Sequence, residues 1–95
     1  MRLSKEHQHI IRQSVVRYDA DAEVILFGSR VNDALRGGDI DLLIRSDRLN
    51  KQDLWPIRRD ILDAIGWQKL DLILERKTGD LRPISCVALK TGVSL

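Results

Sequence analysis

Three short apolar runs, separated by segments with helical spacing, limit most strongly how this chain can fold. Each run has the length of a strand. The runs cover Glu23–Phe27, Asp39–Ile44 and Leu70–Leu74. Helical spacing is seen in Ser4–Tyr18, with Ser4 as the N-cap, and in Lys51–Ile65. This alternation predicts helices packed against a small sheet of three or more strands.

The remaining segments complete the expected order of elements. Ser29–Asn32 could open a short helix, and Leu35–Gly38 is a loop that contains two glycines. Proline is tolerated in a first helical turn, so Pro56 places the start of the main second helix near Trp55. Leu81–Lys90 is a final short helix. The order is α-β-α-β-α-β-α, an α+β chain with α/β-like alternation, and the residues alone leave the strand directions open.

Length and composition exclude several classes of protein. A chain of 95 residues is expected to form a single domain over residues 1–95. One cysteine, Cys86, rules out an internal disulfide and fits a reducing compartment, and no apolar run approaches the length of a membrane span. We therefore expect a cytoplasmic protein. Its core is small for its surface, so a partner or a homo-oligomer could add stability.

The first chemical signal is Asp39-Ile40-Asp41. In a strand, residues two apart project from the same face, so the two aspartates stand side by side while Ile40 enters the core. Two neighbouring carboxylates repel each other unless a proton or a cation intervenes. Mg²⁺ suits such a pair, because it prefers oxygen ligands and is usually held by one or two carboxylates plus substrate phosphates. Taken alone, the pair also fits a solvated strand face.

The second signal is a glycine turn at the end of a strand. Phe27 is followed by Gly28, Ser29 and Arg30, and then by the expected helix start. Glycine allows a phosphate to approach the backbone, and the amides of a helix N-terminus favour an anion. The Ser29 hydroxyl can donate to a phosphate oxygen, and Arg30 can neutralise it. Gly-Ser turns are common, so this signal is weak by itself.

The third signal is Asp71, which stands between Leu70 and Leu72. If the leucines face the core, Asp71 lies on the opposite face, where a neighbouring strand could bring it beside Asp39 and Asp41. Three carboxylates and a phosphate cradle are the parts that nucleotidyl transfer needs, because two metal ions can clamp the attacking and leaving oxygens at phosphorus.

These motifs and their spacing resemble the signature of the DNA polymerase β-like nucleotidyltransferase superfamily. Gly28-Ser29 precedes Asp39-Ile40-Asp41 by nine residues, and Asp71 follows between apolar neighbours. The stretch Val24–Ile44 and the ending Ala88–Leu95 are similar to minimal nucleotidyltransferases, called MNT domains. The resemblance implies the nucleotidyltransferase fold, with a mixed sheet. Many relatives carry Arg-Ala-Arg-Gly directly after the Gly-Ser pair, whereas this chain reads Arg30-Val31-Asn32-Asp33.

The resemblance also implies roles for individual residues. Gly28 and Ser29, with Arg30, would bind the phosphates of a nucleoside triphosphate, ATP above all. Asp39 and Asp41 would ligate two Mg²⁺ ions. Asp71 would help to bind the metal nearest the acceptor and could assist deprotonation of the acceptor hydroxyl.

The implied function is transfer of AMP from ATP to a hydroxyl on a partner protein. In the pairs that the resemblance points to, the partner is a helical HEPN-type toxin or a related substrate-binding protein, and the transferase is the antitoxin. The alternative is a non-enzymatic module that binds nucleotide or occludes a toxin. An RNA-modifying enzyme is disfavoured, because a net charge of +2 without a basic stripe does not predict independent binding of nucleic acid.

Other residues are predicted to have structural roles. Trp55 and Trp67 are expected in the core or at an interface, with stacking on a base as the less favoured alternative. Cys86 is expected to pack as a small apolar residue. Glu75 is interpreted as part of a charged, exposed strand exit.

Overall fold

The computed structural model describes residues 3–28 and 39–95. Along these residues the helices are α1 (Lys5–Val16), α2 (Leu54–Ile65) and α3 (Pro83–Thr91), with a short 3₁₀ turn η2 (Lys51–Asp53) before α2. The strands are β1 (Glu23–Phe27), β2 (Ile40–Arg45), β3 (Leu70–Glu75) and β4 (Val93–Ser94). The expected helix Ser29–Asn32 and loop Leu35–Gly38 lie outside the described residues.

Local sequence signals explain where the helices begin and end. The side chain of Ser4 caps α1 by accepting a hydrogen bond from the backbone N–H of His7 at 3.1 Å. Pro83 is the first residue of α3, where its missing N–H has no intrahelical partner to lose. Helix α2 ends at Gly66, which has a φ of +89°. These boundaries confirm the predicted helices to within a few residues.

The described strands form one mixed sheet in the order β3-β2-β1-β4. Strand β1 is antiparallel to both β2 and β4, whereas β2 and β3 are parallel. The mixed α+β fold confirms the expected fold class. The two-residue strand β4 was not predicted, because Val93 and Ser94 are too short a run to show a period.

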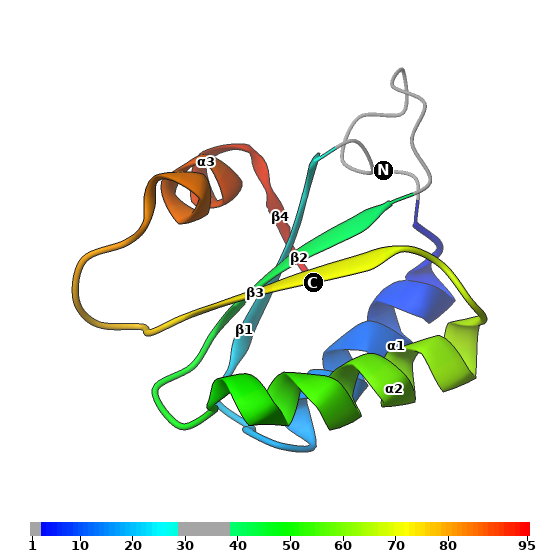
Figure 1. The fold of residues 1–95 in the computed structure, drawn as a ribbon. Coiled ribbons are helices and arrows are strands. Elements are labelled where there is room, and N and C mark those ends of the chain that lie inside the picture. Colours follow the sequence, from blue (N-terminus) through cyan, green and yellow to red (C-terminus); the bar gives the residue numbers. More distant parts are fainter. Residues whose placement is uncertain (1–2, 29–38) are drawn as a thin grey trace.

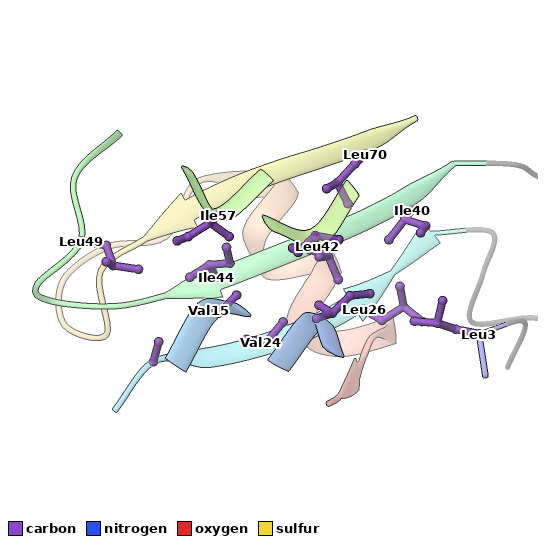
Figure 2. Packing of buried hydrophobic residues seen from close by; sticks show 13 residues of the cluster. Leu3, Val15, Val24, Leu26, Ile40, Leu42, Ile44, Leu49, Ile57 and Leu70 are labelled. Atoms are coloured by element: carbon purple, nitrogen blue, oxygen red, sulfur yellow. The ribbon is translucent and has the colours of Figure 1, made fainter. Parts of the chain in front are cut away.

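Helices cover the two faces of the sheet unequally (Figure 1). Helices α1 and α2 lie together on one face, where Leu26, Leu42 and Ile44 of the sheet are buried against them. Figure 2 shows this larger part of the core, with Val15 and Ile57 reaching the sheet from the two helices. Helix α3 covers the other face, where a smaller cluster buries Ile25, Phe27, Leu43 and Ala88.

Several residues lie elsewhere than the sequence suggested. Trp55 and Trp67 are 75% and 80% exposed, which contradicts a position in the core, while the predicted position at an interface stays a prediction. Cys86 is an exposed free thiol on α3. Glu75, expected at the surface, is buried. No helix in the described part of the chain is long and apolar enough to cross a membrane.

Candidate active site

The parallel pairing of β2 and β3 sets Asp41 directly beside Asp71. Both residues occupy the pleat positions that face α3, because Leu43 and Ile73, two residues further along each strand, pack in the smaller cluster on that side. The two carboxylates therefore project from the same face of adjacent strands. The sequence predicted that Asp71 lies beside both Asp39 and Asp41, and the register provides the pairing with Asp41.

Asp39 lies just before β2, and its carboxylate faces a cation. The Nζ atom of Lys69 is 3.5 Å from Oδ2 of Asp39, and both side chains are about half exposed or more. In residues 3–28 and 39–95, no three Asp, Glu, His or Cys side chains are grouped closely enough to hold a metal ion together. The structure thus brings Asp41 and Asp71 together and leaves Asp39 paired with Lys69.

Gly28 lies at the end of the sheet where Asp41 is found. It follows Phe27, whose pairing partner in β2 is Asp41. Its φ of +79° lies in the region that favours glycine. A Cβ atom at this position would collide with Oδ2 of Asp41. With the carboxylate in its present position, only glycine fits here. The predicted phosphate contacts Ser29 and Arg30 lie outside the described residues.

The pKa of Asp41 is raised above its ordinary value of 3.8. Partial burial is the largest cause, followed by the negative charge of Asp71, a hydrogen bond between the two carboxyl groups, and the charge of Asp39. Lys69 acts in the opposite direction. Simultaneous ionisation of these carboxylates is therefore unfavourable, and binding of a proton or a cation between them relieves the repulsion.

A divalent cation with hard, oxygen-seeking chemistry fits these residues. The donors are carboxylate oxygens, the pair of Asp41 and Asp71 concentrates negative charge, and the carboxylate of Asp41 lies against the bare backbone of Gly28. Asp39 would join such a cation by exchanging its contact with Lys69. Lys69 is the site residue that sequence analysis missed, and only the register of β2 against the start of β3 reveals it.

Comparison with known families decides what kind of chain carries this arrangement. Residues 9–85 match the family model described as a nucleotidyltransferase domain, which is well over half of the chain. The chain belongs to this nucleotidyltransferase domain family. No curated protein matches it at a significant level.

The family match covers all the elements that build the site in this nucleotidyltransferase domain. It begins within α1, includes Gly28, Asp39, Asp41 and Asp71, and ends within α3. The chain is therefore a nucleotidyltransferase by family, and this reaction class fits an acidic pair that suits a divalent cation.

Proposed function

We propose that this chain is a Mg²⁺-dependent nucleotidyltransferase that moves AMP from ATP to a hydroxyl on a partner protein. The observation that carries the proposal is the pairing of Asp41 with Asp71 beside the bare backbone of Gly28. The family match supports the reaction class. The nucleotide, the acceptor and the residue roles below are proposals.

Each site residue has a role in this proposal. Asp39 and Asp41 would hold Mg²⁺, with Asp71 contributing on the acceptor side. When bound, Mg²⁺ neutralises phosphate charge and polarises the phosphorus centre. Gly28 would let the triphosphate approach the backbone, and Ser29 and Arg30 would contact its outer phosphates. The positive charge of Lys69 is well placed to exchange between Asp39 and a phosphate oxygen.

The transfer is an in-line displacement at the α-phosphorus. The acceptor hydroxyl oxygen forms a bond to the α-phosphorus, and the bond from that phosphorus to the α,β-bridging oxygen breaks. Pyrophosphate leaves with the electron pair. A carboxylate oxygen of Asp71 takes the hydroxyl proton, as a general base positioned on the strand next to the metal-binding residues.

The resemblance to minimal nucleotidyltransferases supports a separate polypeptide as acceptor. We propose a helical HEPN-type or related substrate-binding protein, with modification by this chain as the antitoxin activity. A partner of this kind would be encoded beside the transferase.

The test is an assay with ATP labelled at the α-phosphate, Mg²⁺ and the product of the adjacent gene. Label should appear on the partner protein, and pyrophosphate should be released in equal amount. Asp41→Asn and Asp71→Asn should each lower the rate by about 10²-fold or more, the usual contribution of such groups. Asp63→Asn, at an exposed position on α2, is the matched control and should retain the rate.

Unlabelled partner protein after prolonged incubation would exclude the proposed acceptor. Full activity of Asp41→Asn would exclude the proposed site. Calorimetry of ATP binding with and without Mg²⁺ separates a transferase from a binding module. Partner neutralisation without any nucleotide binding would favour the non-enzymatic alternative.

A further inference from the structure

A groove runs along the free edge of the sheet, on the outer side of β3. Its volume is about 410 Å³. One wall is formed by the start of α2 and the turn before it, and the opposite wall is formed by Arg82, the N-cap residue of α3. Strand β3 forms the floor. We call it the β3 groove, and its principal lining residues are Lys51, Trp55, Arg58, Leu72, Leu74 and Arg82. An adjoining hollow of about 300 Å³ shares Lys51 and Leu74 and adds Arg76.

The backbone of β3 offers hydrogen-bonding groups to this groove. At the two ends of the ladder, Ile40 N–H donates to the carbonyl of Lys69 and Ser46 N–H donates to that of Glu75, both at 2.9 Å. Given the parallel register, odd-numbered residues of β3 bond to β2, so the N–H and C=O groups of Leu70, Leu72 and Leu74 point outward. Within the described sheet β3 is thus an edge strand, and its outer side, which pairs with no described strand, faces the groove.

Two arginines cover the ends of this edge and leave its centre open. Arg58 donates to the carbonyl of Leu70, and Arg82 donates to that of Leu74 at 2.9 Å. In the described part of the chain, no hydrogen bond satisfies the outward groups of Leu72. An added strand centred on Leu72 could bond to both of these groups without displacing β2.

The charge of the groove selects an acidic partner. Lys51, Arg58 and Arg82 line it, and Arg76 borders the adjoining hollow. Glu75 lines the adjoining hollow, and it already accepts a hydrogen bond from Arg82 at 2.5 Å. Asp71, the other acidic residue of β3, is not among the residues that line the groove. Pairing of β3 with β3 of a second copy, antiparallel about Leu72, would place Arg58 of one copy beside Arg82 of the other. Repulsion between like charges disfavours that arrangement.

Trp55 supplies an apolar anchor above the groove. It is 75% exposed although it stands in the first turn of α2, next to the partly buried Leu54. Tryptophan is among the residues that contribute most to binding energy when a partner covers them. An open strand edge, cations and one exposed tryptophan together fit a peptide better than a nucleic acid, because strand pairing uses main-chain groups that a nucleic acid lacks.

We propose that the β3 groove binds an extended, acidic polypeptide segment that adds to the sheet as a strand beside β3. The identity of this segment as part of the acceptor rests on the proposed function. A strand along this edge passes Asp71, which is adjacent to Leu72 in the chain and projects toward the α3 side. A serine, threonine or tyrosine of the segment, opposite Asp71 and on the same face, would present its hydroxyl there.

Binding is tested directly with a fluorescein-labelled peptide of about six residues, the usual length of a strand, in which glutamate and valine alternate. Fluorescence anisotropy with the full chain, without nucleotide or metal, should show saturable binding that weakens as salt is raised. Lys51→Glu and Trp55→Ala should each weaken it by about tenfold or more. The matched controls are Lys5→Glu and Trp67→Ala, exposed residues outside the groove, which should bind like the wild type.

Two further probes decide the mode of binding. The same peptide with alternate backbone nitrogens methylated keeps its charges but cannot pair as a strand, and it should not bind. A single-stranded oligonucleotide of equal charge should bind more weakly than the peptide. Equal binding of the methylated peptide, tighter binding of the oligonucleotide, or no effect of Lys51→Glu would overturn the proposal.

The result is independent of the transfer reaction. Asp41→Asn should bind the peptide like the wild type, because its side chain lies away from the groove lining. Peptide binding without any transfer activity would support the β3 groove as a peptide site and contradict the proposed function. Transfer to a partner protein without peptide binding would support the proposed function and contradict the peptide site.

Discussion

Among single residues, Asp41 lowers the stability of the metal-free chain, because its ionised carboxylate is partly buried beside other acidic groups. Asp41 pairs with Asp71 on the neighbouring strand, and its carboxylate lies against the backbone of Gly28. The raised pKa of Asp41 means that the folded chain prefers the protonated carboxyl. This preference contributes stability that is present below the ordinary pKa of 3.8 and is lost as pH rises through the raised value.

Replacement of Asp41 by asparagine should therefore stabilise the metal-free chain at neutral pH. Relief of one close like-charge contact is worth roughly 1 kcal/mol in a well-solvated site. Urea unfolding at pH 7 in the presence of a chelator measures the gain, and the gain should disappear at pH 3. Addition of Mg²⁺ should stabilise the wild type but not the variant. A less stable variant at pH 7 without metal would contradict this account of the acidic pair.

Gly28 makes a second prediction at a single position. Gly28→Ala should destabilise the chain because alanine is strained at a φ of +79° and because its Cβ would collide with the carboxylate of Asp41. Gly79→Ala is the matched control: its φ is +97°, but nothing lies within 4 Å of the added atom. Strain alone costs about 1–2 kcal/mol, so Gly79→Ala should lose that much and Gly28→Ala more.

The same pair of variants separates strain from loss of function. Nucleotide binding should fall sharply in Gly28→Ala and remain in Gly79→Ala, as measured by calorimetry with ATP and Mg²⁺. Equal loss of stability in the two variants would show that the contact with Asp41 does not contribute to the free energy of unfolding.

Among the elements of structure, α3 is tied to the sheet by a polar contact as well as by its small apolar cluster. The carboxylate of Glu75, at the end of β3, accepts hydrogen bonds from Arg82 at 2.5 Å and from Ser85 at 2.8 Å. Ser85 is fully buried in α3. Hydrogen bonds from Arg82, then from Ser85, lower the pKa of Glu75 and outweigh the effect of its burial.

Loss of this contact should loosen the attachment of α3. Glu75→Ala leaves the buried hydroxyl of Ser85 without its acceptor, which should cost about 2 kcal/mol in the free energy of unfolding at pH 7. Glu23→Ala is the control, because Glu23 is half exposed and its ion pair with Arg45 is expected to contribute less than about 1 kcal/mol.

The lowered pKa of Glu75 also fixes how this prediction depends on pH. Its stabilising effect is present above the ordinary value of 4.5 and is lost as pH falls through the lowered pKa. The difference between the wild type and Glu75→Ala, measured by urea unfolding, should therefore shrink in strong acid. A difference that stays constant down to pH 2 would mean that the carboxylate is not the stabilising group.

For the molecule as a whole, local periodicity predicted the elements, but not the contacts between distant residues. The strand Glu23–Phe27 and the cap at Ser4 depend on neighbours in sequence, and both were predictable. The position of Asp71 beside Asp41 needed a guess about strand pairing. The burial of Glu75 could not be predicted, because it depends on partners on another element, seven and ten residues away. The exposure of Trp55 likewise could not be predicted, because an apolar side chain fits both a core position and an interface.

The unequal packing on the two faces predicts that the chain does not open as one unit. The α1 and α2 face buries most of the core, with residues such as Ile11, Ile57 and Ile61 fully covered, whereas α3 contributes Ala88 to the smaller cluster and keeps Ile84 and Val87 exposed. Regions with few buried apolar contacts open at lower free energy than the core. Native-state hydrogen exchange should therefore show α3 opening at a free energy about 2 kcal/mol or more below that of β2.

Two core variants distinguish this partial opening from global unfolding. Leu89→Ala, in the cluster under α3, should speed exchange in α3 and leave the amides of β2 nearly unchanged. Ile61→Ala, in the larger cluster, should lower the global free energy by about 2–5 kcal/mol and speed exchange in β2. Because α3 covers the face from which Asp41 and Asp71 project, its opening changes access to that face without unpairing β2 from β3. Identical effects of the two variants on α3 and β2 would show instead that both faces of the sheet unfold together.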